Sequence, residues 1–216
     1  MDCKKICFIM CVNNDSSFNE AIYYINHLNI PDGYSIDCIT IYDSTSMASG
    51  YNEAMNASDA KYKIYMHQDV FIIDPDFLYK ILAIFDDNSI GLIGLVGAQS
   101  MPHNGIMWAK KEIGALYSTY IYGKNKKFFD TSSDKYVEAD AVDGFLMATQ
   151  ADLPWREDLF DGWDFYDASQ SFEFRKNGYK VVIPANREPM AIHNDGLLNL
   201  RSYHKYRKIF LNEYMS

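Results

Sequence analysis

The sequence lacks the short motifs that mark several large classes of nucleotide-binding and hydrolytic proteins. Neither GxGxxG nor GxxxxGKS/T, the two commonest phosphate-binding loops, occurs, so a dinucleotide-binding fold is unsupported. The HExxH motif of metalloproteases and the GxSxG motif of hydrolases are also missing. No internal repeat, low-complexity tract or linker is found, which favours a single domain over residues 1–216.

Long apolar runs and an excess of positive charge are absent as well. No apolar run reaches membrane-spanning length, and the one near the N-terminus stops at Asn13 without a small-residue cleavage site, which predicts a cytoplasmic protein. Lys and Arg number 20 against 29 Asp and Glu, which argues against a nucleic-acid partner. One basic run indicates either a solvated helix face or a peripheral contact with a phosphorylated substrate or the inner face of the membrane. Its members are Arg201, His204, Lys205, Arg207 and Lys208.

Cysteine is scarce, and its pattern argues against a metal cluster. Cys3, Cys7 and Cys11 recur every four residues in a segment rich in strand-forming residues, and no CxxC pair occurs. Along an extended strand at about 3.3 Å per residue, the three thiols are too far apart to share one ion. We therefore expect free, buried thiols in a reducing cytosol.

What is present is an alternation of apolar strands and amphipathic helices. Strands are predicted at 5–12, 35–42, 62–66 and 90–97, with helices at 17–29, 47–58 and 75–85 between them. Such alternation favours right-handed crossovers and a mostly parallel central sheet flanked by helices, so the fold class is α/β. The second half is less regular: 99–135 is rich in loops, and a strand at 145–149, a helix at 164–177 ending before Gly178, a strand at 179–184 and a helix from about 198 to 214 follow.

Polar side chains follow the ends of the first three predicted strands. Asn13, Asp43 and Asp69 stand there, and ligands of parallel sheets bind beyond the carboxyl ends of the strands. Asp69 suits a hard divalent cation that grips a diphosphate, although a helix cap or a surface loop explains one carboxylate equally well. His193 follows the last predicted strand, as a metal ligand or as a structural histidine.

A second acidic cluster stands at the start of the helix predicted for 164–177. Asp164 and Asp167 share one face there and favour the helix dipole, which is the simplest explanation of both. One of them can instead serve as a general base held by packing. Aromatic residues that can provide this packing and stack on a sugar are Trp163, Phe165 and Tyr166.

Four segments together resemble the family 2 glycosyltransferases, and in particular a branch with a His-Gln-Asp motif. They are IYDSTSMASGYNEAMNASDAKYKIYMHQDVFI, VDGFLMAT, FYDASQSFEFRKNGYKVVIP and IHNDG, in matching order from about Ile6 to Gly196. The resemblance implies a type-A glycosyltransferase fold, with a nucleotide-binding half over about 1–98 and an acceptor-side half over about 99–216. It implies a UDP-, GDP- or dTDP-sugar donor, Mn²⁺ or Mg²⁺, and a glycan or lipid-linked acceptor in surface-glycan synthesis.

The resemblance also assigns roles to single positions. Gln68 and Asp69 occupy the place of the family's Asp-x-Asp motif, so Asp69 would coordinate the cation, and His193 resembles a histidine that some members add to the metal site. Counting back from Gly178 to the family's Glu-Asp motif gives Asp167 as the general base of an inverting transfer, with Asp164 as second choice. The residues implied to bind the nucleotide sugar are Val12, Asn13, Asp43, Asn52, His67, Gln68, Asp69, Asp143 and Gly144.

Two positions depart from the family pattern. His67 replaces the first aspartate of Asp-x-Asp, which bears on metal binding, and Tyr166 replaces the glutamate beside the base, which bears on acceptor chemistry. The chain is short for an acceptor domain, so partners or a membrane-bound acceptor would complete the site; whether the chain forms a homo-oligomer stays open. Two alternatives to an active enzyme stay open: a nucleotide-sugar-binding protein without transfer, and a protein-interaction module of the same fold.

Overall fold

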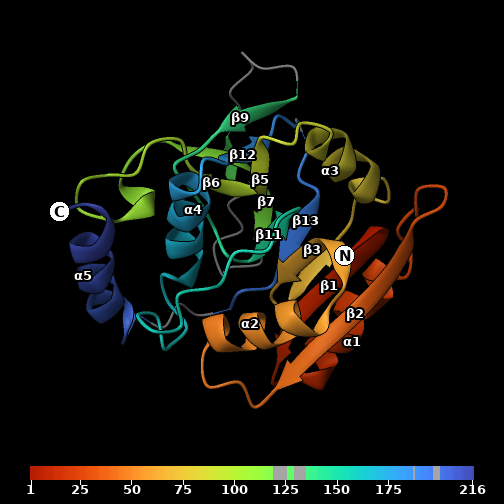
Figure 1. The fold of residues 1–216 in the computed structure, drawn as a ribbon, viewed down its shortest axis with the longest axis horizontal. Coiled ribbons are helices and arrows are strands. Elements are labelled where there is room, and N and C mark those ends of the chain that lie inside the picture. The colour runs from red at the N-terminus through yellow and green to blue at the C-terminus, as the bar shows by residue number, and fades with distance from the viewer. Residues whose placement is uncertain (119–125, 129–134, 187, 197–199) are drawn as a thin grey trace.

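The structure is a computed structural model that describes residues 1–118, 126–128, 135–186, 188–196 and 200–216 (Figure 1). The helices are α1 (Asp15–Ile25), α2 (Met47–Ala57), α3 (Phe77–Phe85), α4 (Tyr166–Lys176) and α5 (Tyr203–Tyr214), with a 3-10 turn at Met107–Ala109. The strands are β1 (Asp2–Val12), β2 (Ser35–Tyr42), β3 (Ala60–Met66), β4 (Val70–Ile72), β5 (Ile90–Gly94), β6 (Val96–Ala98), β7 (Glu112–Ser118), β8 (Lys126–Phe128), β9 (Tyr136–Glu138), β10 (Ala141–Val142), β11 (Leu146–Thr149), β12 (Lys180–Pro184) and β13 (Ala191–His193).

The central sheet has the strand order β2-β1-β3-β11-β5-β12-β9. Strands β2, β1, β3, β5 and β12 run in one direction, while β11 and β9 oppose them. The predicted α/β class with a mostly parallel sheet is confirmed. The antiparallel β11 lies between β3 and β5, so residues from the second half of the chain enter the middle of the sheet formed by the first half.

The strand predicted at 90–97 is divided between two sheets. Its first part is β5 in the central sheet, and after Leu95 the chain continues as β6, which pairs with β7 and β10. This second sheet has the order β10-β6-β7-β13-β4, and β8 also pairs with β7. Periodicity could not predict the division, because both parts are buried and apolar.

Strand β1 shows why the central sheet is covered on both faces. Ile6, Phe8 and Met10 belong to the apolar core that includes α1 and α3, while Cys7 and Ile9 belong to the core that includes α2. A strand buried on both faces reads as a continuous apolar run, as the sequence does. A third apolar cluster joins α4 to α5, which lies beside α4 at the edge of the molecule in Figure 1.

Local capping sets where the helices begin and end. The Asn14 side chain accepts from the N–H groups of Ser16 and Ser17, so α1 begins earlier than predicted. Helix α3 begins at Phe77, two residues after the predicted start. Gly178 has φ +82°, and it follows the end of α4 as predicted. Helix α5 begins at Tyr203; residues 197–199, near its predicted start, lie outside the described residues.

The four cysteines are free thiols, as predicted, but they are not equally buried. Cys7 is buried, Cys11 is partly buried, and Cys3 and Cys38 are exposed. The expectation of buried thiols was therefore wrong for Cys3, which lies near the exposed start of β1. Cys38 lies on the edge strand β2.

Candidate active site

The tripeptide His67–Asp69 forms a turn between β3 and β4. The N–H of His67 donates to the carbonyl of Phe145, just before β11, and the N–H of Val70 donates back to the carbonyl of His67. The distances are 3.0 and 3.2 Å. The turn is therefore held at both ends by backbone hydrogen bonds, and β11 contributes to its support.

Gln68 connects this turn to the loop after β1. Its Oε1 accepts from the N–H groups of Asn13 and Asn14 at 2.9 and 2.8 Å, and its Nε2 donates to Oδ1 of Asn13 at 2.5 Å. The Gln68 amide thus fixes the end of β1, where the sequence predicts nucleotide binding, and its polar atoms already have partners within the chain.

His193 is brought to the same turn by strand register. It ends β13 and pairs with Val70 in the antiparallel β13–β4 ladder, and the N–H of Asn194 donates to the carbonyl of Asp69 at 2.9 Å. The Phe145 ring stacks on the His193 imidazole with centroids 5.3 Å apart. Residues distant in the sequence therefore converge through one short ladder.

His67, Asp69 and His193 form a group able to hold a metal ion. Each offers one ligand atom, and these atoms lie within 4.8 Å of one another. Nε2 of His193 is 3.5 Å from Oδ1 of Asp69 and 3.3 Å from Nδ1 of His67. The sequence predicted Asp69 and His193 as ligands but placed His67 among the nucleotide-binding residues. His67 could have been predicted as a metal ligand from its side chain alone, since imidazole is the commonest protein metal ligand.

The pKa values of the two histidines are shifted in opposite directions. Burial and the neighbouring His193 together lower the pKa of His67 to about 4, so His67 is neutral near pH 7. Burial also lowers the pKa of His193, but the Asp69 carboxylate and the nearby Asp143 outweigh it, and the His193 pKa is raised. The two histidines in turn lower the pKa of Asp69 against the effect of its burial. A neutral imidazole and an ionised carboxylate are the forms that ligate metals.

The turn borders a cavity of about 370 Å³ at the ends of β1, β2 and β3, which we name the strand-end cavity. Six predicted nucleotide-sugar-binding residues line it, as expected from the strand-end rule. Sequence reasoning did not select Cys11, Ser44 and Met47 as lining residues. The complete lining is Cys11, Val12, Asn13, Asp43, Ser44, Met47, His67, Gln68, Asp69 and Trp163.

Two lining residues have unusual local settings. Asp43 adopts φ +56°, a left-handed conformation that is rare outside glycine, although Asp tolerates it better than most residues. Such strain concentrates at functional sites. Trp163 keeps 52% of its surface exposed although it borders the cavity, so an apolar face is available to a planar ligand.

Asp167 lies in the first turn of α4 and contacts the loop before β11. Its Oδ2 accepts from the N–H of Gly144 at 3.0 Å and its Oδ1 from that of Ala168 at 2.8 Å. Burial and the neighbouring charge of Asp143 together raise the pKa of Asp167 to about 7. Asp143 itself accepts from the N–H of Phe145. Of the predicted pair, Gly144 is thus hydrogen-bonded to the predicted base, while Asp143 acts on it through its charge; neither lines the strand-end cavity.

The other predicted site residues are placed differently. Asp164 is partly buried in the turn before α4, and this burial raises its pKa. Asn52 does not line the strand-end cavity. Its Nδ2 donates to the carbonyl of Trp155 at 2.9 Å, and its Oδ1 accepts from the N–H of Trp155 at 2.8 Å, so this side chain fastens α2 to the segment after β11.

Members of the predicted basic run make contacts within the protein. Lys205 pairs with Asp161 at 3.0 Å, and Nε of Arg207 donates to the carbonyl of Asn104. Across the described parts of the chain, no helix has both the length and the apolar character needed to cross a bilayer.

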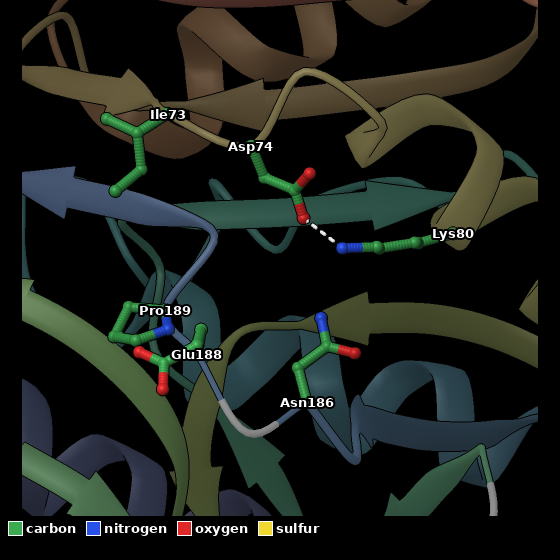
Figure 2. Close-up of a pocket in the computed structure, with 6 residues that line it drawn as sticks. All are labelled: Ile73, Asp74, Lys80, Asn186, Glu188 and Pro189. Atoms are coloured by element: carbon green, nitrogen blue, oxygen red, sulfur yellow. Dashed lines mark hydrogen bonds and ion pairs between the residues drawn. The ribbon is translucent and has the colours of Figure 1, made fainter.

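A second cavity, of about 440 Å³, lies at the other end of β4 and β13 and is named the β4–α3 cavity. Figure 2 shows Asp74 and Lys80 facing each other on one side and Asn186 and Glu188 on the opposite side. Asp74 and Lys80 form an ion pair. The lining residues are Ile73, Asp74, Lys80, Asn186, Glu188 and Pro189.

Solved structures of glycosyltransferases share this fold. TarS of S. aureus in complex with UDP has 8% identity and a TM-score of 0.62, over 97% of this chain and 65% of that one. The mannosyltransferase PcManGT from Pyrobaculum calidifontis, in complex with GDP-Man and Mn²⁺, has 12% identity and a TM-score of 0.58, over 95% and 60%. GalNAc-T7 with UDP, GalNAc and Mn²⁺ has 11% identity and a TM-score of 0.64, over 99% and 49%.

The architecture is thus the type-A glycosyltransferase fold, and identities this low show the fold alone. The chain belongs to the glycosyltransferase-like family, whose family model matches residues 7–214. No curated protein matches its sequence significantly. The chain spans only 40% of a longer TarS structure and about half to two thirds of the other neighbours described above.

Proposed function

We propose that this chain transfers a sugar from a nucleoside-diphosphate sugar to an acceptor hydroxyl, with inversion and with a divalent cation. The observation that carries the proposal is the His67–Asp69–His193 group at the strand-end cavity, on a fold whose solved members hold UDP, UDP-GlcNAc or GDP-Man. Two of those neighbours also hold Mn²⁺. The acceptor we expect is a glycan or a lipid-linked glycan of a cell surface.

The residues present fit a divalent cation. Two imidazole nitrogens and one carboxylate oxygen converge, and this mixed donor set suits Mn²⁺ better than Mg²⁺, which prefers oxygen ligands. His67, Asp69 and His193 would hold the ion. When bound, a divalent cation neutralises negative charge on a departing diphosphate.

The residues around this group have separate tasks in the proposal. Val12, Asn13 and Asp43 bind the nucleoside, and Trp163 stacks on a ring of the donor. Asp143 and Gly144 face the donor sugar and the acceptor. Asp167 takes the proton of the acceptor hydroxyl, and its pKa of about 7 is suited to a general base at neutral pH. One displacement with one base inverts the anomeric centre.

The proposal is tested by turnover of UDP- and GDP-sugars with Mn²⁺ and a panel of glycan acceptors. We expect the nucleoside diphosphate to be released only when the cation is present. In Asp167→Asn, kcat should fall about 10²–10⁴-fold. Asp164→Asn is the matched control, because it removes a neighbouring carboxylate from the turn before α4.

Three outcomes distinguish the proposed function from its alternatives. Loss of activity in Asp164→Asn but not in Asp167→Asn would move the base to Asp164. Nucleotide binding without turnover in any combination would favour the non-catalytic binding protein. Neither binding nor turnover would favour an interaction module.

A further inference from the structure

The two positions at which this sequence departs from the family pattern contact each other. Nε2 of His67, in the turn after β3, lies 2.5 Å from the phenolic oxygen of Tyr166, the first residue of α4. His67 was expected to weaken metal binding and Tyr166 to alter acceptor chemistry. Their contact joins the two departures into one feature.

The two ring nitrogens of His67 face different partners. Nδ1 faces His193, within the group able to hold a cation, and Nε2 faces Tyr166, away from that group. In a neutral imidazole only one of the two ring nitrogens carries a hydrogen. An imidazole that ligates through Nδ1 therefore carries this hydrogen on Nε2. The Tyr166 oxygen is placed to accept that hydrogen. Histidine ligands of metals are generally oriented by such an acceptor on the second nitrogen.

Tyr166 is itself held firmly by its surroundings. Only 5% of its surface is exposed, and its ring packs among those of Tyr51 and Trp155. Its hydroxyl lies against Gly144, where an added Cβ would be 2.2 Å from the phenolic oxygen. The same Gly144 donates its N–H to Asp167. A side chain at position 144 would therefore displace Tyr166 from His67.

We propose that Tyr166 is a positioning residue for the metal centre. It accepts the Nε2 hydrogen of His67 and holds Nδ1 toward the cation. Binding of the cation is thereby coupled to the position of the first turn of α4, which carries Asp167. The inference rests on the proposed metal site and extends it to a residue that touches neither cation nor substrate.

The test is the affinity of the full chain for Mn²⁺ alone, measured by calorimetry and by electron paramagnetic resonance of free Mn²⁺. Tyr166→Phe should weaken binding about 10–100-fold, the usual cost of losing an outer hydrogen-bond partner of a ligand. Tyr51→Phe is the matched control, since the buried Tyr51 hydroxyl has no hydrogen-bond partner among the described residues and its ring packs in the same cluster. It should bind Mn²⁺ like the wild type.

A double-mutant cycle distinguishes positioning from general damage. In a His67→Ala background, Tyr166→Phe should cause no further loss of Mn²⁺ affinity, because the hydrogen bond is already gone. An equal loss in both backgrounds, or wild-type affinity in the single Tyr166→Phe variant, would overturn the inference.

A measurement on the wild type decides the matter if Tyr166→Phe does not fold. With diamagnetic Zn²⁺ bound, nitrogen NMR should show His67 protonated at Nε2 and ligated at Nδ1; the opposite tautomer overturns the inference while the metal site stands. If the wild type binds neither Mn²⁺ nor Zn²⁺, the proposed metal site fails and the inference with it.

Discussion

The cavities at the two ends of β4 and β13 differ in how their polar groups are partnered. In the larger β4–α3 cavity, Lys80 lies against Asp74. In the smaller strand-end cavity, His67 and Asp69 converge with His193. Burial lowers the pKa of His67, whereas the carboxylates near His193 raise its pKa against the effect of burial. Convergent donors with shifted pKa values, rather than volume, mark a functional cavity.

The largest expected effect is the loss of a metal ligand. UDP or GDP at a hundred times its Kd should stabilise the wild type by about 2.7 kcal/mol. His193→Ala should remove the part of this stabilisation that depends on Mn²⁺. Thermal-shift titrations with and without Mn²⁺ measure this. An undiminished Mn²⁺-dependent shift in His193→Ala would remove His193 from the metal site.

The next effect concerns the dependence of stability on pH. Asp167 has a pKa of about 7 in the folded chain against an ordinary 3.8, so the folded state favours its protonated form. Its contribution therefore becomes less favourable as pH rises from about 4 to 7 and is constant above. Between pH 5 and 8, the free energy of unfolding of the wild type should fall by about 2 kcal/mol relative to Asp167→Asn. Urea unfolding at both pH values measures this, and an equal pH dependence in the two proteins would contradict it.

A comparable effect is expected for the exposed aromatic at the strand-end cavity. Trp163→Ala should weaken nucleotide binding by about 1–3 kcal/mol if the indole stacks on the base. Trp108→Ala is a suitable control, because Trp108 is 40% exposed but does not line this cavity. Equal affinities of both variants, measured by calorimetry, would show that Trp163 makes no stacking contact with the base.

The smallest effect should come from the β4–α3 cavity. Lys80→Met removes an ion pair in which Lys80 is about half exposed, so the free energy of unfolding should change by about 0–1 kcal/mol. Nucleotide and Mn²⁺ affinities should match those of the wild type. A loss of nucleotide affinity in Lys80→Met would break the contrast between the cavities.

Much of the strand-end cavity was predictable because strand ends are local features. Asn13 and Asp43 follow apolar runs, and parallel crossovers bring such ends to one edge. Asn52 shows the limit of this reasoning. Its position on α2 follows from the sequence, but its hydrogen bonds to Trp155 depend on how a distant segment packs.

The sequence by itself determined the α/β class, the family and the side chains available for chemistry, since periodicity and motif order are local properties. Only the tertiary structure decided that β11 enters the sheet antiparallel, that His67 joins Asp69 and His193, and that Tyr166 meets His67. The physical reason is that these contacts depend on strand register and on packing between distant segments. A shift of one residue in strand register moves every side chain of that strand to the other face of the sheet.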